Sequence, residues 1–200
     1  MREPLQTGDL VLVRESPRHW AMAALDWLIR TATRSPYSHA GVLLRDPPFV
    51  DTPGLYVWES GWEDGEPDPQ DHLVKFGVQL TAWDTFVAHN PGELWVRRRG
   101  PGARLRLHDI VRIHRQVYRK PYDDDPLDWL EAAVREDGRP RKLDRFWCSA
   151  LVAYILVRCG TLPAGLDWSA VRPADLSSES HELEWLHPYG EDTRLVGTEK

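Results

Sequence analysis

Cysteine is scarce in this chain of 200 residues, which contains only Cys148 and Cys159. The two cysteines lie about three turns apart if they belong to one helix, which is too far for a disulfide. They also match no metal-binding spacing, and we expect neither a metal nor an organic cofactor. Each thiol therefore stays available for chemistry.

Long apolar runs and an excess of positive charge are absent as well. No run approaches the roughly 18 residues of a membrane-spanning helix, and the N-terminal residues lack the apolar core of a signal peptide. We therefore expect a cytoplasmic protein without a membrane span. The net charge of −6 excludes the basic face of a general nucleic-acid binder, so we expect no nucleic-acid partner.

Short apolar segments separated by Gly- and Pro-rich turns predict an α+β fold. Five segments read as strands, at residues 9–13, 39–44, 55–59, 77–81 and 94–98. Apolar side chains at helical spacing predict helices at residues 16–35, 83–88, 107–118 and 127–134. A last helix, capped by Asp144, is expected to end at Gly160. The residues after it are rich in Pro, Ser and Glu, and they predict a wrapping extension with a frayed end.

The last predicted helix carries Cys148 in its first turn. Apolar residues follow Cys148 at spacings that place them on one face, so Cys148 could be only a small buried residue. The start of a helix, however, offers free N–H groups and a dipole that favour a thiolate. The N–H of Cys148 could also donate to an oxyanion.

Two polar residues stand at the ends of neighbouring predicted strands. His39 opens the strand at residues 39–44, and Glu59 closes the one at 55–59. A histidine can take the proton of a cysteine thiol, and a carboxylate on its far nitrogen orients the ring. His39 could instead have only a structural role, and Glu59 could be a solvated charge at the edge of the sheet. The presence of all three residues in these positions nevertheless favours a Cys148–His39–Glu59 triad.

Aromatic residues and an acidic loop supply the candidates for substrate contact. The chain has 10 tryptophans, most of which we assign to packing. Tyr37 and Trp147 directly flank the two motifs, and Trp62 begins an acidic, Gly- and Pro-rich loop at residues 62–72. We expect that loop to have low local stability and to border the active cleft, either as a lid or as a plain connector.

These motifs resemble the NlpC-type papain-like cysteine peptidases. Those enzymes carry a C-S-x-L-V helix, then G-D-L, then S-H-x-G-I/V, and then a polar residue on the next strand. The same pieces occur here in a different order: Gly8-Asp9-Leu10 and Ser38-His39-Ala40-Gly41-Val42 come first, and Cys148-Ser149-Ala150-Leu151-Val152 comes last. That order is similar to the circularly permuted, YiiX-like branch, which is distantly related to the lecithin:retinol acyltransferases.

The resemblance implies a permuted papain-like catalytic domain at residues 1–176, followed by a partly flexible C-terminal extension at 177–200. It implies an antiparallel sheet that carries His39 and Glu59, with the Cys148 helix packed against it. The implied function is a thiol hydrolase of amide or ester bonds, acting on a small peptide, acyl-amide or lipid-ester substrate. Two alternatives stay open: acyl transfer by the same triad to a lipid or amine, and a non-catalytic binding module on this scaffold.

Overall fold

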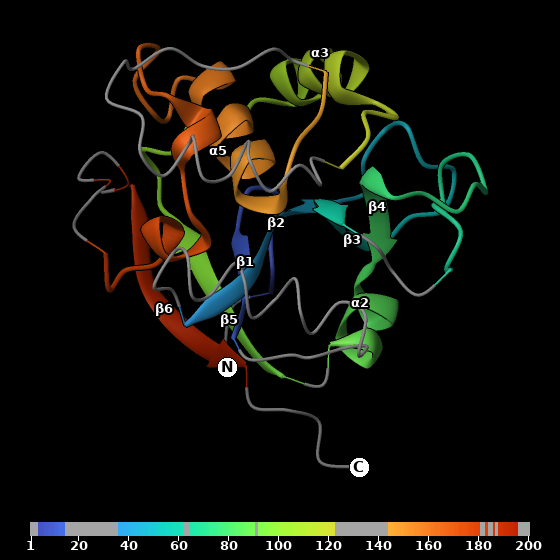
Figure 1. Cartoon of the computed structure of the whole chain (residues 1–200), viewed down its shortest axis with the longest axis horizontal. Helices are drawn as coiled ribbons and strands as arrows, with labels where there is room; N and C mark the ends of the chain where they lie inside the picture. Colours follow the sequence, from blue (N-terminus) through green and yellow to red (C-terminus); the bar gives the residue numbers. More distant parts are fainter. Residues whose placement is uncertain are drawn as a thin grey trace.

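A single antiparallel sheet with α-helices on it forms the α+β fold of this chain (Figure 1). The computed structural model describes residues 4–14, 36–61, 65–90, 92–122, 144–180, 183, 186 and 188–195. The predicted helices at 16–35 and 127–134 and the side chain of Trp62 lie outside these described residues. None of the helices within them is long and apolar enough to cross a bilayer.

The sheet has six strands in the order β4-β3-β2-β1-β5-β6, and every neighbouring pair is antiparallel. The strands are β1 (Leu10–Arg14), β2 (Tyr37–Arg45), β3 (Leu55–Gly61), β4 (Gly77–Ala82), β5 (Glu93–Arg99) and β6 (Tyr189–Leu195). The helices are α2 (Trp83–His89), α3 (Leu107–Val117) and α5 (Cys148–Arg158), with short 3-10 turns η1 (Trp168–Ala170) and η2 (Pro173–Leu176). The five strands and the helices at 83–88 and 107–118 that the sequence predicts are confirmed to within two residues.

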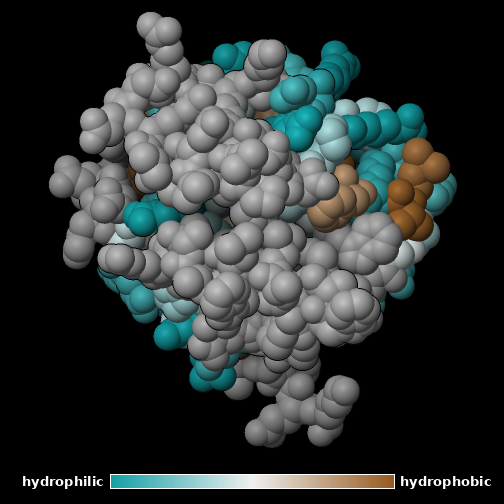
Figure 2. Space-filling view, in the orientation of Figure 1, coloured by the Kyte–Doolittle hydropathy of each residue, from teal (hydrophilic) through white to brown (hydrophobic). Residues whose placement is uncertain are grey.

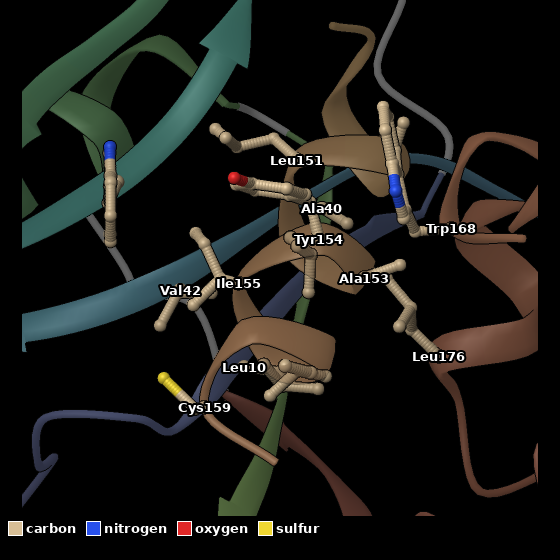
Figure 3. Close-up of a cluster of buried hydrophobic side chains, with 14 of the residues drawn as sticks. Leu10, Ala40, Val42, Leu151, Ala153, Tyr154, Ile155, Cys159, Trp168 and Leu176 are labelled. Carbon is tan, nitrogen blue, oxygen red and sulfur yellow. The ribbon is translucent and has the colours of Figure 1, made fainter. Parts of the chain in front are cut away.

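Alternation along the strands sends apolar side chains into two separate cores. On one face, Leu10 of β1 and Val42 of β2 pack with Ile155 of α5, and Figure 3 shows α5 enclosed between such sheet residues and the C-terminal turns. On the other face, Val57 of β3 packs with Phe86 of α2. The central strands are therefore buried on both sides, which explains their nearly continuous apolar sequences.

The sixth strand is a feature that the sequence did not predict. β6 pairs with β5, so part of the predicted extension is an integral strand of the sheet. Arg97 of β5 is buried and donates to the carbonyl oxygens of Gly190 (2.9 Å) and Leu176 (3.0 Å). The strand itself alternates mostly polar residues, because only Tyr189 at its start is buried. Backbone pairing and a buried arginine hold it in place, rather than an apolar pattern that could be read from the sequence.

The described part of the acidic loop is tied down. Asp68 is buried and accepts hydrogen bonds from Lys75 Nζ (2.7 Å) and from the backbone N–H of Leu80 (3.0 Å). Asp71 accepts from the Tyr118 hydroxyl (2.6 Å) at the end of α3. Although burial favours its neutral form, the hydrogen bonds from Tyr118, Lys75 and Arg119 hold the pKa of Asp71 below its usual range. From residue 65 onward, then, hydrogen bonds connect the loop to β4 and α3, and its expected low local stability stays a prediction.

Close packing in the middle of the sheet depends on Gly41 of β2. A Cβ at this position would lie 2.5 Å from Cγ1 of Val57 and 3.4 Å from Cγ1 of Val11. We predict that Gly41→Ala lowers the free energy of unfolding by about 1–3 kcal/mol, because a buried overlap must be relieved by strand displacement. Chemical denaturation measures this change.

Two further variants separate a local clash from a general effect of glycine replacement. Gly41→Ala combined with Val57→Ala should be more stable than the sum of the single changes predicts, because the clashing methyl group is gone. Gly165→Ala, where no atom lies within 4 Å of the added Cβ, should leave stability nearly unchanged. If the double variant shows simple additivity, overlap with Val57 is not the cause.

Candidate active site

The N-terminus of α5 presents Cys148 as the first helical residue. Trp147 before it has extended backbone angles (φ −87°, ψ 170°), and no side chain caps the helix. The expectation that Asp144 is the cap is therefore wrong. The physical reason is that the N–H of Phe146 donates to the carbonyl oxygen of Pro121 (3.1 Å), which keeps the chain extended as far as Trp147. The N–H groups of the first turn consequently have no side-chain acceptor.

Two buried serines hold this start of the helix from opposite directions. The hydroxyl of Ser60 on β3 donates to the carbonyl oxygen of Phe146 (2.7 Å). The hydroxyl of Ser149 on α5 donates to the carbonyl oxygen of Val171 (2.7 Å), which precedes η2. Both serines have no exposed surface. Ser60 thus ties the segment before Cys148 to the sheet, whereas Ser149 ties the helix to the C-terminal turns.

His39, Glu59 and Thr81 form a hydrogen-bonded row across three neighbouring strands. Nε2 of His39 lies 2.5 Å from Oε2 of Glu59, and the Thr81 hydroxyl donates to Oε1 of Glu59 (2.5 Å). Glu59 has no exposed surface, whereas the His39 side chain is 16% exposed. A Cβ at Gly61 would lie 3.2 Å from Cε1 of His39, so the missing side chain there leaves room for the ring.

Cys148, the first residue of α5, lies close to this row. The pairing of β2 with β3 ends at Val42 and Trp58, one position before Glu59 on β3 and short of His39 on β2. The side chain of Cys148 is close enough to the His39 ring for hydrogen bonding and charge to favour the protonated imidazole. Since Glu59 occupies Nε2, the thiol is left with Nδ1. The structure therefore brings together all three residues that the sequence singled out.

The two halves of this arrangement belong to opposite faces of the sheet. His39 lies 6.1 Å from Phe86 between ring centroids, on the face that α2 covers. The body of α5 packs on the other face. Cys148, the first residue of α5, is the residue of this helix that lies close to the His39 ring. The sequence predicted a helix packed on the sheet, but not that the thiol and the imidazole approach from different faces.

The electrostatics of the row favour a charged imidazole. Burial by itself would lower the pKa of His39, but hydrogen bonds to Cys148 and Glu59, together with their negative charges, raise it from 6.5 to about 10. The second cysteine behaves differently. Burial, assisted by the charge of Asp109, raises the pKa of Cys159 to about 12, so this thiol stays protonated at neutral pH.

The residues predicted to contact substrate have varied surroundings. Tyr37 is buried, and its hydroxyl donates to Oδ2 of Asp192 on β6 (3.2 Å), a contact that joins β2 to the edge strand. Trp147 is partly buried against the main core. Their contact with substrate stays a prediction. Sequence reasoning missed Ser60 and Thr81, although two-residue alternation along the predicted strands places Thr81 on the face of Glu59.

Among the described residues, no group of three or more His, Cys, Asp or Glu side chains could hold a metal ion. A scan against protein-family models found no match for this chain, and neither did a search of curated proteins. Function is therefore inferred from the site residues themselves.

The Ser60 contact predicts a specific effect on the thiol. Ser60→Ala removes the bond that holds Phe146 to β3, so Cys148 should shift relative to His39. We expect the rate of Cys148 alkylation by iodoacetamide at pH 7 to fall about three- to tenfold, in line with the loss of one buried hydrogen bond. Mass spectrometry of the labelled peptide measures the rate.

Ser149→Ala is the matched control for this experiment, because it removes an equally short and equally buried bond on the other side of the helix. It should cost similar stability, about 1–2 kcal/mol, while changing the alkylation rate less than about twofold. Equal loss of reactivity in both variants would mean that Ser60 acts only through general stability.

The raised pKa of His39 predicts a pH dependence of stability. The charged ring stabilises the fold fully below about pH 6.5, and this contribution is lost as the pH rises towards about 10. The free energy of unfolding of the wild type should therefore fall across this interval. Glu59→Gln and Cys148→Ala should each make the fall shallower, because each removes a group that favours the imidazolium.

Urea denaturation at a series of pH values measures these profiles. Cys159→Ala is the control below about pH 8, where the thiol of Cys159 is protonated in both the folded and the unfolded chain, so its profile should run parallel to that of the wild type there. Wild-type slopes in both Glu59→Gln and Cys148→Ala would contradict the assignment of the transition to His39.

Proposed function

We propose that this chain is a thiol hydrolase that cleaves an amide or ester bond through a covalent acyl-enzyme. The observation that carries the proposal is the continuous row of Cys148, His39, Glu59 and Thr81 at the first turn of a helix. A thiol, an imidazole and an orienting carboxylate in this order are the parts of an activated cysteine nucleophile. Thr81 supports the carboxylate from its far side.

Acylation would begin with the proton of Cys148 on Nδ1 of His39, which leaves a thiolate beside an imidazolium. The thiolate attacks the carbonyl carbon of the substrate, and the electron pair of the C=O bond moves onto the oxygen. Free backbone N–H groups at the start of α5, including that of Cys148, supply donors for this oxyanion. As the carbonyl re-forms, the bond to the leaving group breaks, and Nδ1 of His39 gives that group its proton.

Deacylation would use the same groups in reverse. His39, now neutral, takes a proton from water, and the resulting hydroxide attacks the thioester carbon. The thioester bond breaks, the acid product leaves, and the thiolate–imidazolium pair is restored. Glu59 stays ionised throughout, because its role is to fix the ring and stabilise its charged form. The steps described use only side chains, backbone N–H groups and water.

The same reasoning supports the permuted papain-like relationship. We infer that the sheet of β1 to β4 followed by α5 corresponds to the papain-like arrangement with its cysteine helix moved to the end of the chain. Three features support this inference: the G-D-L segment leads into β1, the S-H-x-G-V segment forms β2, and Glu59 lies on the adjacent strand. The substrate is expected to be a small peptide, acyl-amide or lipid ester.

The decisive experiment is detection of the acyl-enzyme. The protein is incubated with p-nitrophenyl esters and p-nitroanilides of different acyl chains, quenched in acid and examined by intact mass and peptide mapping. We expect one acyl group on Cys148, release of p-nitrophenol, and loss of both in Cys148→Ala. Cys159→Ala should be unchanged, and Glu59→Gln should lower turnover by about 10²- to 10⁴-fold while retaining the fold.

Other outcomes separate the competing functions. If added amines or lysolipids collect the acyl group faster than water does, the protein is an acyltransferase that uses the same residues. If no substrate acylates Cys148 and iodoacetamide labels it no faster than Cys159, the site is not catalytic. A binding module on this scaffold would then explain the structure better.

A further inference from the structure

The outer surface of α3 and the loop before β3 enclose an open groove that the proposed chemistry does not use. The groove consists of two hollows of about 840 and 490 Å³ that share Pro48, Val111 and Arg115. One hollow is completed by Leu107, His108, Arg112 and Gln116, and the other by Phe49, Gln70, His114 and Tyr118. We call this continuous surface the α3 groove.

Apolar side chains form the floor of the α3 groove. Leu107 and Val111 lie four positions apart on α3 and hence on one side of the helix, and Leu107 is 61% exposed. Such exposure is unusual for a leucine in this chain, where most large apolar side chains are buried. Pro48 adds an apolar wall from the facing loop.

The charge of the α3 groove is opposite to that of the whole chain. The chain carries 31 acidic residues and a net charge of −6, yet none of the described residues that line either hollow is an aspartate or a glutamate. Arg112 is paired with Asp109 (2.8 Å). Arg115, which both hollows share, makes no hydrogen bond or ion pair with any residue that the structure describes. Hydrophilic atoms dominate the described surface over α3 in Figure 2.

The far end of the α3 groove is held in a defined shape. The ring of His114 stacks on Phe49 with 3.7 Å between centroids, and its Nε2 lies 2.8 Å from Oε1 of Gln70. Burial lowers the pKa of His114 to about 4, so this histidine is neutral and adds no charge. The hydroxyl of Tyr118 is bound to Asp71. A preformed wall lowers the entropic cost of binding a ligand.

We propose that the α3 groove binds an acidic peptide segment of a partner protein. An apolar side chain of that segment would rest on Val111 and Pro48. A neighbouring carboxylate would pair with the guanidinium of Arg115, which has no partner among the described residues and favours bidentate carboxylate binding. α3 has 11 residues and is about 16 Å long, which an extended peptide spans with about five residues. A trough open to solvent suits an extended peptide better than it suits a small molecule, which usually binds in an enclosed pocket.

This proposal does not rest on the hydrolase activity. The α3 groove contains none of Cys148, His39, Glu59 and Thr81, and its test needs no turnover. Binding is measured by fluorescence anisotropy with the full chain and a labelled peptide of about ten residues that alternates Glu with Leu. We expect a dissociation constant on the order of 10–100 µM at physiological salt. Replacing Glu by Lys in the peptide, or Leu by Ser, should each weaken binding at least about tenfold.

Charge-reversal variants test the site on the protein. Arg115→Glu should weaken binding of the Glu–Leu peptide at least about tenfold and improve binding of the Lys–Leu peptide. Arg106→Glu is the matched control: it makes the same change on an exposed arginine just before α3 that does not line the groove, and we expect an effect below about threefold. Val111→Asp should also abolish binding, and thermal denaturation checks that each variant is folded.

Three outcomes would overturn the proposal. Equal effects of Arg115→Glu and Arg106→Glu would reduce the interaction to unspecific charge attraction. If replacing Leu by Ser in the peptide leaves the dissociation constant unchanged, the apolar side chains of the groove do not contribute to binding. Arg115-dependent binding to phosphatidylserine vesicles without peptide binding would assign the surface to an anionic lipid instead.

Discussion

The buried carboxylate of Glu59 is the constraint on which the site and the centre of the sheet depend. An ionised side chain without solvent contact is costly unless charged or polar groups compensate for its lost hydration. Glu59 finds those groups on the two neighbouring strands, in the ring of His39 and the hydroxyl of Thr81. The requirement connects β2, β3 and β4, since a shift of one residue in any pair would turn one partner to the other face.

Ser60, the residue after Glu59 on β3, connects the sheet to the segment that carries Cys148. Glu59 and Ser60 point to opposite faces of β3, so Glu59 orients His39 while Ser60 holds the segment before Cys148. One short stretch of strand thereby positions both the base and the nucleophile that we propose. Two adjacent residues of β3, Glu59 and Ser60, therefore contact both of the motifs that are far apart in the sequence, the His39 motif and the Cys148 motif.

The α3 groove lies apart from the residues of the proposed active site and has a different chemical character. Around α3, arginines lie beside an exposed leucine, and the lining residues that the structure describes include no acidic one, although the chain as a whole is acidic. The anchored loop from residue 65 onward forms part of its wall through Gln70 and supports Tyr118 through Asp71. The sequence left open whether this loop is a lid or a plain connector; in its described part, Asp68 of the loop is paired with Lys75 just beyond it.

Local pattern by itself determined much of this protein: five strands, the α2 and α3 helices and the three residues of the candidate triad all follow from alternation, helical spacing and short motifs. Such features depend on neighbours in the sequence, which is why they can be read from it. The cap of α5 and the strand β6 could not be read, since a backbone carbonyl of Pro121 and the buried side chain of Arg97 decide them from far along the chain. Only the tertiary structure decided that a helix packed on one face of the sheet brings Cys148 close to His39 on the other face, because that meeting depends on long-range packing of α5 and no local residue pattern encodes it.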